Sequence, residues 1–281
     1  MAVLVTVVLW ASAFVGIRTA GRHFSPGPLA LGRLLVGSLV IGAVVLARRE
    51  PLPGRRDLPR IVVCGALWFG LYNVTLNAAE RRIDAGTAAM LVNIGPILIA
   101  VLAGLFLKEG FPRQLLLGCV VAFAGVAVIG VATSHSSIAP STGVLLCLLA
   151  AGAYATALVT QKVILRCVSA LQTTFLCCLV GTIVCLPFGP SLAGELHRSP
   201  GGTIAWIAYL GAFPTALAFT TWAYALARSS AGRLAVTTYL VPPISVFLGW
   251  ALLDESPPAL AFLGGALCLA GVVVARRRPA T

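Results

Sequence analysis

Long apolar runs follow one another along the whole chain, separated by short segments rich in proline, glycine and arginine. A helix that crosses the hydrocarbon core of a bilayer needs about 20 apolar residues, and about 17 suffice at the lower limit. We therefore predict an all-α membrane protein with ten transmembrane helices. The ten runs are residues 2–17, 29–47, 61–79, 85–107, 115–132, 142–161, 170–188, 203–227, 232–253 and 259–275.

The composition agrees with a lipid environment. Of the 281 residues, 59% are hydrophobic and 10% are charged, whereas about a quarter of the residues in a soluble domain are charged. The net charge of +12 comes from arginines in short clusters between the runs. No basic face with interleaved aromatic residues is visible, so we expect a lipid bilayer as partner and no nucleic acid.

The eight cysteines form no CxxC pair and no Cys/His spacing typical of a metal site. Most of them lie inside the apolar runs, so we interpret them as small apolar residues. There is no Walker motif, and we predict neither a metal nor another cofactor.

The positive charges predict an orientation. With the N-terminus in the cytoplasm and alternating sides, 14 of the 20 Lys and Arg residues fall inside, 5 fall outside, and Arg33 lies within a run. Cytoplasmic loops carry the excess of Lys and Arg. We therefore predict a multi-pass protein of the bacterial inner (plasma) membrane with both termini cytoplasmic.

An internal repeat relates the two halves of the chain at a spacing of 146 residues. No gap is needed from the third run to the fifth, and proline, glutamate and glycine match in register. We predict one five-helix repeat over residues 1–132, an outside linker over residues 133–141, and a second repeat with a short basic tail over residues 142–281. The matching pairs are Gly65/Gly211, Gly86/Gly232, Pro96/Pro242, Glu109/Glu255, Pro112/Pro258, Gly118/Gly264 and Gly125/Gly271.

The two repeats are expected to have inverted topology. Five is an odd number, so the second repeat enters the membrane from the side opposite to the first. The loop with Lys108 and Arg113 then lies inside, and its counterpart at Asp254 and Glu255, which has no basic residue, lies outside. Inverted repeats are used for alternating access, in which two similar halves rock about a central site.

The chain resembles the EamA-type family of the drug/metabolite transporter superfamily. The resemblance rests on Trp10–Phe14, on Leu31–Arg33, and on the two stretches from proline to glutamate with the glycine-containing helices that follow them. It implies a carrier of small metabolites, often an exporter, with a cavity between the halves. Gln172 and Thr174 lie where a counterpart of Arg33 would be, so we expect any anion site to be one-sided.

Polar and aromatic residues inside the runs are candidates for the wall of that cavity. Such residues also hydrogen-bond neighbouring helices or anchor a helix at the interface, so both interpretations stay open. The set favours amino acids, nucleosides or amphipathic drugs over sugars. The candidates are Trp10, Ser12, Arg33, Tyr72, Asn73, Asn77, Asn93, Tyr154, Trp222, Thr238 and Tyr239.

Two prolines and two glutamates are candidates for gating. Pro96 and Pro242 predict bends in their helices, which serve either packing or gating. Glu109 and Glu255 end the same helices, where they either terminate the span or form an ion pair that locks one face. Arg33 either reaches the interface or binds an anionic group of the substrate.

We predict a secondary active transporter that exports small metabolites or drugs. The alternatives are an uptake carrier for nucleoside-like or amino-acid-like metabolites, and a membrane scaffold without transport. A membrane enzyme would need a constellation of His, Asp or Glu, and a channel would need repeated filter residues; the sequence has neither. Small residues along runs 115–132 and 259–275 favour close helix packing or a homodimer contact.

Overall fold

The computed structural model describes residues 1–80, 82, 91–133, 142–253 and 258–277. All regular structure in these residues is helical, and nine helical segments are long and apolar enough to cross a membrane. The apolar helix α6 (Gly95–Phe106) is shorter; residues 91–94 precede it, and residues 83–90 lie outside the described ranges. The chain is thus an all-helical, multi-pass membrane protein, and the prediction of ten spans stays a prediction.

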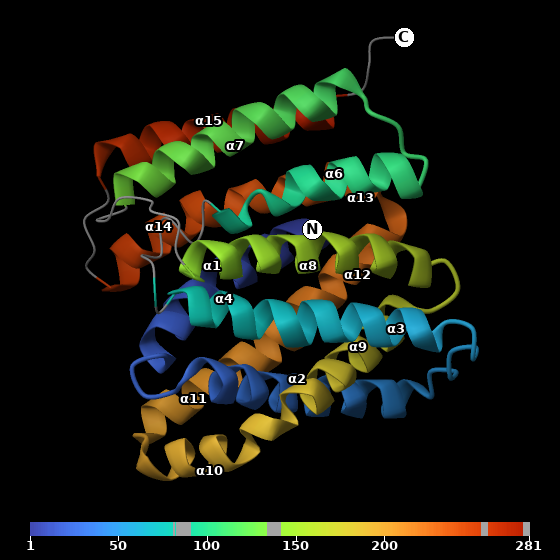
Figure 1. Cartoon of the computed structure of the whole chain (residues 1–281), viewed down its shortest axis with the longest axis vertical. Helices are drawn as coiled ribbons and strands as arrows, with labels where there is room; N and C mark the ends of the chain where they lie inside the picture. Colours follow the sequence, from blue (N-terminus) through green and yellow to red (C-terminus); the bar gives the residue numbers. More distant parts are fainter. Residues whose placement is uncertain (81, 83–90, 134–141, 254–257, 278–281) are drawn as a thin grey trace. The chain divides into compact units, whose positions relative to one another are not determined.

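The chain forms two compact units, and each contains helices from both predicted repeats. Unit 1 comprises residues 1–74 and 160–228, and unit 2 comprises residues 75–159 and 229–281. The units divide the molecule in space, whereas the predicted repeats divide the sequence. The boundaries of the units therefore do not test the boundaries of the repeats. The helices are coloured along the chain in Figure 1.

Unit 1 is built mainly from nine helical segments and the ends of two others, α4 (Asn73–Glu80) and α8 (Thr142–Ile164). The nine are α1 (Ala2–Ala20), α2 (Pro26–Arg48), α3 (Leu58–Cys64), the π-helix η1 (Gly65–Tyr72), α9 (Ala170–Cys185), α10 (Gly189–Arg198), α11 (Gly201–Leu210), the π-helix η3 (Gly211–Leu217) and α12 (Ala218–Arg228). A short 3₁₀ turn, η2 (Leu186–Phe188), joins α9 to α10.

Unit 2 contains the remaining helices and most of α4 and α8. They are α6, α7 (Arg113–Thr133), α13 (Ala231–Val236), the 3₁₀ turn η4 (Thr237–Leu240), α14 (Val241–Leu253) and α15 (Ala259–Arg276).

Two π-helices occur at equivalent places of the predicted repeats. η1 begins at Gly65 and η3 begins at Gly211, which are 146 residues apart. A Cβ atom on Gly65 would lie 2.6 Å from the Cys177 carbonyl oxygen, and one on Gly211 would lie 2.7 Å from the Arg33 carbonyl oxygen. Glycine therefore lets both π-helices approach the backbone of a neighbouring helix. π-Helical turns are uncommon and are often found at functional sites.

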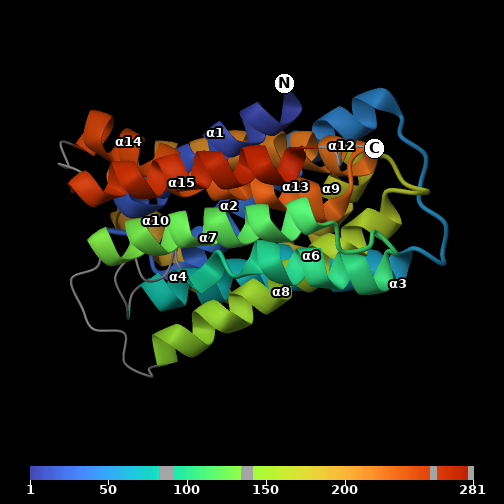
Figure 2. The same ribbon diagram turned by 90° about the horizontal axis from the view of Figure 1, so that it is seen from above.

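Glycine also brings α7 and α15 together in unit 2. A Cβ atom on Gly118 would lie 2.6 Å from the Gly271 carbonyl oxygen, and one on Gly125 would lie 2.5 Å from the Gly264 carbonyl oxygen. The early residue of α7 thus faces the late residue of α15, so these two helices pack antiparallel. They lie side by side in both Figure 1 and Figure 2.

Helices α2 and α9 of unit 1 also pack antiparallel. A Cβ atom on Gly27 would contact the Phe188 ring just after α9, and one on Gly42 would contact the Phe175 ring near its start. Between them, the Ser38 hydroxyl lies 3.0 Å from the Thr182 hydroxyl. Hydrogen bonds of this kind hold helices together in lipid, where apolar faces provide no net driving force between them.

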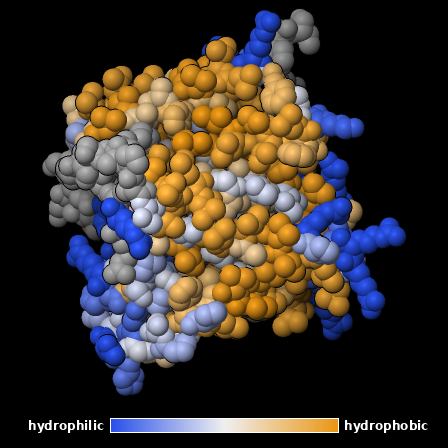
Figure 3. Space-filling model, in the orientation of Figure 1, coloured by the Kyte–Doolittle hydropathy of each residue, from blue (hydrophilic) through white to orange (hydrophobic). Residues whose placement is uncertain are grey.

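Many large apolar side chains are exposed, as a bilayer requires. In Figure 3 they cover much of the face toward the viewer, and exposed examples are Leu117 and Val120 on α7 and Phe262 and Leu269 on α15. Seven of the eight free cysteines are buried and Cys167 is exposed. The interpretation of the cysteines as small apolar residues is confirmed.

The two prolines that the repeat relates, Pro96 and Pro242, lie where helical geometry changes. Pro96 is in the first turn of α6, where a backbone N–H would have no partner within the helix. Pro242 is the second residue of α14 and follows the 3₁₀ turn η4. The structure therefore places both prolines at breaks within their spans, while their gating role stays a prediction.

Candidate functional site

The predicted site residues divide between the two units. Unit 1 holds Trp10, Ser12, Arg33, Tyr72, Asn73 and Trp222. Unit 2 holds Asn77, Asn93, Tyr154, Thr238, Tyr239, Pro96, Glu109 and Pro242. Glu255 lies outside the described residues.

Arg33 is a buried charge on α2. Its side chain is 6% exposed, and its Nε donates a hydrogen bond to Thr215 Oγ1 on η3 at 3.1 Å. Tyr72, the last residue of η1, lies within electrostatic range of the guanidinium. Among the described residues, no carboxylate forms an ion pair with Arg33. Within a membrane helix, a buried charge without such a partner is a candidate for a functional site.

An aromatic cluster lies in the same unit. The ring centroids of Trp10 and Trp222 are 5.0 Å apart, those of Trp10 and Phe219 are 5.2 Å apart, and those of Trp68 and Phe219 are 5.1 Å apart. Phe69 joins the cluster at 4.6 Å from Phe219. These spacings are those of favourable aromatic pairs. We call these five residues the aromatic cluster.

The sequence analysis included Trp10 and Trp222 but missed Phe69 and Phe219. The sequence contains one signal for each of these two residues, namely its closeness to a tryptophan. Phe69 follows Trp68, and Phe219 precedes Trp222 by three residues, about one helical turn. Neither signal distinguishes a residue of the interior from one that faces lipid. The aromatic cluster is linked to Arg33 through η1, which contains Trp68 and Phe69 and ends at Tyr72.

Several buried polar atoms of unit 1 have no hydrogen-bond partner among the described residues. Both tryptophans of the cluster that were predicted, Trp10 and Trp222, have such an Nε1. Buried polar groups are nearly always paired, and an unmet one costs about 1–3 kcal/mol. These donors and acceptors are therefore candidates for bonds to a bound molecule. The others in unit 1 are the side-chain amide of Gln161, Gln172 Oε1 and Thr173 Oγ1.

Two predicted site residues of unit 1 instead bond to the protein. Ser12 Oγ donates to the Leu9 carbonyl oxygen at 2.9 Å and lies 2.7 Å from the Tyr209 hydroxyl on α11. Asn73 Nδ2 donates to the carbonyl oxygens of Trp68 at 3.1 Å and Phe69 at 3.0 Å, near the end of η1. These bonds tie α1 to α11 and stabilise the π-helix.

The predicted residues of unit 2 lie in packed surroundings. Tyr239 is fully buried in the apolar core of this unit, and its hydroxyl has no hydrogen-bond partner among the described residues. Thr238 Oγ1 donates to the Ala235 carbonyl oxygen at 2.7 Å. The Tyr154 ring packs where a side chain on Gly95 would be, 2.7 Å from an added Cβ. Asn77 is 7% exposed, and Asn93 is half-buried just before α6.

Glu109 of unit 2 accepts hydrogen bonds from the start of α13. Its carboxylate receives the backbone N–H groups of Ala231 at 2.7 Å and Gly232 at 3.1 Å. The preceding residue, Lys108, has a φ of 58°, a left-handed conformation in the turn that presents the carboxylate. Glu109 thus lies just after the end of α6 and caps the start of α13, and no ion pair of Glu109 is present among the described residues. Its gating role stays a prediction.

Comparison with known proteins assigns the chain to a family. The model of the EamA-like transporter family matches residues 1–131 and 141–277. The chain belongs to this family. It is thus a membrane transporter, and the predicted resemblance is confirmed.

Named relatives extend along nearly the whole chain. A protein of Streptantibioticus cattleyicolor named "Probable terminal-alkyne amino-acid exporter" is 38% identical over 99% of this chain and 93% of its own length. The transporter YdfC of Bacillus subtilis, whose function is uncharacterised, is 33% identical over 94% of this chain and 86% of its own length. A "Probable amino-acid metabolite efflux pump" of Salmonella typhimurium is 26% identical over 96% of this chain and 92% of its own length.

A solved crystal structure has the same fold. It superposes on this chain with a TM-score of 0.81 and covers 98% of this chain and 95% of its own. The sequence identity is 20%, so this likeness concerns the fold alone.

Proposed function

We propose that the EamA transporter described here is a secondary active exporter of amino acids or related amphipathic carboxylates. The observation that carries the proposal is Arg33, a buried guanidinium without a carboxylate partner among the described residues. A guanidinium binds a carboxylate through parallel hydrogen bonds that are stronger than bonds between neutral groups. The α-carboxylate of an amino acid would supply the missing negative charge.

The aromatic cluster would receive the apolar part of the substrate. Trp68 and Phe69 precede Tyr72 on η1 by three or four residues, about 5 Å along a helix. This separation suits a small molecule with a carboxylate at one end and an apolar side chain at the other. The Nε1 atoms of Trp10 and Trp222 would supply hydrogen bonds to polar groups of the substrate. Two relatives named as an amino-acid exporter and an amino-acid metabolite efflux pump support the same substrate class.

Alternating access is the proposed mechanism. Equivalent helices of the two predicted repeats pack antiparallel, namely α7 with α15 and α2 with α9. Equivalent helices of repeats inserted in the same sense would run parallel when placed side by side. The matched positions of η1 and η3 support the duplication, and the antiparallel pairs support its inversion.

Counterflow in proteoliposomes tests this function. Vesicles loaded with one neutral amino acid should take up its radiolabelled form, and analogues in which the carboxylate is replaced by an amide should fail to compete. Arg33→Gln should reduce uptake at least about tenfold at unchanged protein yield, because one charge-assisted contact is lost. Arg166→Ala changes an exposed arginine of the same unit and is the matched control.

The outcomes separate the function from the site. Wild-type rates in Arg33→Gln would reject Arg33 as the carboxylate site while leaving the transporter assignment intact. A wild-type protein that exchanges no amino acid and no related carboxylate would reject the substrate class. Uptake that is confined to right-side-out vesicles under an imposed gradient would favour import over export.

The proposed orientation places both termini in the cytoplasm of a bacterial inner membrane. The alternation of sides puts Arg60 and Arg166 inside and Arg198 outside. Reporter fusions after Arg60 and Arg166 should be active only with a cytoplasmic reporter, and a fusion after Arg198 only with a periplasmic one. The reverse pattern would overturn the orientation.

A further inference from the structure

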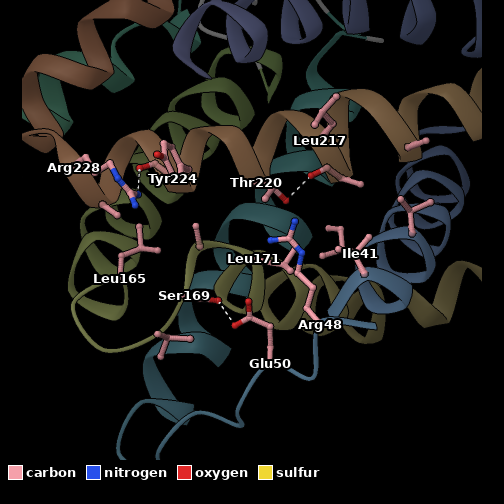
Figure 4. A pocket seen from close by; sticks show the side chains of 17 residues that line it. Ile41, Arg48, Glu50, Leu165, Ser169, Leu171, Leu217, Thr220, Tyr224 and Arg228 are labelled. Atoms are coloured by element: carbon pink, nitrogen blue, oxygen red, sulfur yellow. Dashed lines mark hydrogen bonds between the residues drawn. The ribbon is translucent and has the colours of Figure 1, made fainter. Parts of the chain in front are cut away.

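Unit 1 contains a groove that is separate from the Arg33 hydrogen bond. It has a volume of about 590 Å³ and lies among the second half of α2, the start of α9, and the segment η3–α12. Figure 4 shows the side chains that line it. Its walls are apolar and include Val44, Leu171 and Leu217. Along η3 and α12, Ala212, Ala216 and Thr220 recur every four residues and leave space on one helix face.

The length and exposure of the groove suit an acyl chain. The segment from Ala212 to Arg228 has seventeen residues, and their sixteen steps correspond to about 24 Å of helix. One leaflet of the hydrocarbon core is about 15 Å thick. Val40 is 40% exposed and Leu217 is 43% exposed. The groove is therefore open on its long side to the surface that membrane helices present to lipid.

One end of the groove is positively charged. The Arg48 guanidinium points into the groove in Figure 4, and no described residue forms a hydrogen bond or ion pair with it. The Arg228 guanidinium is held against the Tyr224 ring at 3.6 Å and donates to the Tyr224 carbonyl oxygen at 3.1 Å. The one carboxylate of the lining, that of Glu50, accepts a hydrogen bond from the Ser169 hydroxyl at 2.7 Å.

We propose that this groove binds an anionic phospholipid from the leaflet that its arginine end faces. The phosphate would contact Arg48 and Arg228, where α2 and α12 end, and one acyl chain would lie along Ala212, Ala216 and Thr220. A soluble anion would leave the apolar length unused, and a zwitterionic lipid would match the charge of the two arginines less well. Basic pockets between membrane helices recognise lipid head groups in this way. Because η3 contains both Ala216 and Thr215, the acceptor of Arg33, the bound lipid would also support the transport site.

Native mass spectrometry of the full-length protein tests the proposal, with phosphatidylglycerol and phosphatidylcholine of identical acyl chains as probes. Wild type should bind phosphatidylglycerol about thirtyfold more tightly, because the two arginines near the surface together contribute about 2 kcal/mol to attraction of anionic lipid. The double variant R48Q/R228Q should bind the two lipids with less than about a twofold difference. The matched control R55Q/R56Q changes two exposed arginines outside the groove and should keep the preference.

Two further measurements test the acyl-chain part. Thr220→Phe fills the groove and keeps both arginines, so it should reduce the occupancy of phosphatidylglycerol at least about fivefold. Glycerol 1-phosphate, added to the detergent-solubilised protein, should leave the thermal midpoint unchanged, whereas phosphatidylglycerol should raise it by about 4 °C.

Each contrary result overturns the proposal. If R48Q/R228Q keeps the preference for phosphatidylglycerol, or if R55Q/R56Q loses it to the same extent, the arginines of the groove are not the head-group site. Normal lipid occupancy in Thr220→Phe would show that the acyl chain lies elsewhere. Equal stabilisation by glycerol 1-phosphate would identify a site for soluble anions. If R48Q/R228Q does not fold, the measurements with Thr220→Phe and glycerol 1-phosphate still test the lipid proposal.

Discussion

The two units use the same kind of helix for different purposes. Unit 1 buries Arg33, groups five aromatic rings, and leaves polar atoms such as Trp222 Nε1 without a protein partner among the described residues. In unit 2, backbone meets backbone at Gly118 and Gly125, and the carboxylate of Glu109 is bonded to a helix start. Close contacts of glycine with a neighbouring backbone occur in both units, whereas the buried charge of Arg33 and the aromatic cluster occur in unit 1. We therefore propose that unit 1 contains the recognition site.

This division has a physical basis. Where two helices meet through glycine, their surfaces have no room for a ligand, and van der Waals contact stabilises the pair in lipid. Where large aromatic and polar side chains meet, small movements of the rings make room for a molecule, and unmet hydrogen-bonding groups favour its binding. Substitutions at the glycine contacts should therefore affect folding, and substitutions at Arg33 or in the aromatic cluster should affect transport.

The largest effect is expected for Gly125→Val in unit 2. An added Cβ would lie 2.5 Å from the Gly264 carbonyl oxygen and 2.6 Å from the Cys268 backbone nitrogen, and neither backbone atom can move alone. We expect a loss of about 3 kcal/mol or more, seen as a collapse in the yield of monodisperse protein. Gly152→Ala on α8 is the control, because nothing lies within 4 Å of its added Cβ. Normal yield of Gly125→Val would refute the close packing of α7 on α15.

A smaller effect is expected when a capping carboxylate is removed from either unit. Glu109→Ala removes the acceptor of two backbone N–H groups in unit 2, and we expect a loss of about 2 kcal/mol in thermal denaturation. Glu195→Ala is its match in unit 1, where the carboxylate accepts from the Ser25 N–H at 2.9 Å and the Ser25 hydroxyl at 2.5 Å. If Glu109→Ala melts like wild type while Glu195→Ala does not, the cap in unit 2 is not stabilising.

The smallest effect on stability is expected for Trp222→Phe in unit 1. The phenyl ring is smaller than the fully buried indole, so the free energy of unfolding should fall by about 1 kcal/mol. The donor that is removed has no protein partner among the described residues and adds nothing to this loss. Substrate affinity in counterflow should fall about threefold, the cost of one hydrogen bond to a ligand. Tyr209→Phe is the contrast, because its hydroxyl lies 2.7 Å from Ser12 Oγ. It should lower stability by about 1 kcal/mol and leave affinity unchanged; the opposite pattern would exchange the roles of the two residues.

Much of the fold could be predicted from the sequence. The apolar runs, the buried cysteines and the family followed from residue types and spacings alone, because a bilayer demands long apolar helices and a duplicated chain keeps its glycines and prolines in register. The same spacing of 146 residues that relates Gly65 to Gly211 also relates the starts of the two π-helices. The π-helical geometry itself was not predicted, since it arises where the backbone of a neighbouring helix approaches these glycines.

The site was only partly predictable. Arg33, Trp10 and Trp222 were found because charged and polar groups are rare in membrane helices. Phe69 and Phe219 were missed, and Ser12 and Asn73 proved to be bonded to protein atoms, because the type of a side chain does not reveal its neighbour. Glu109 likewise meets backbone groups 122 and 123 residues away in the chain.

By itself, the sequence determined that this chain is an all-helical transporter of the EamA family with a duplicated pattern. Only the tertiary structure decided that helices of both halves share each unit, that Arg33 is buried against Thr215, and that α7 and α15 meet through glycine. The reason is that a helix in lipid is apolar on all its faces. Its hydrophobic pattern therefore indicates that it spans the membrane but does not indicate which side packs against which neighbour.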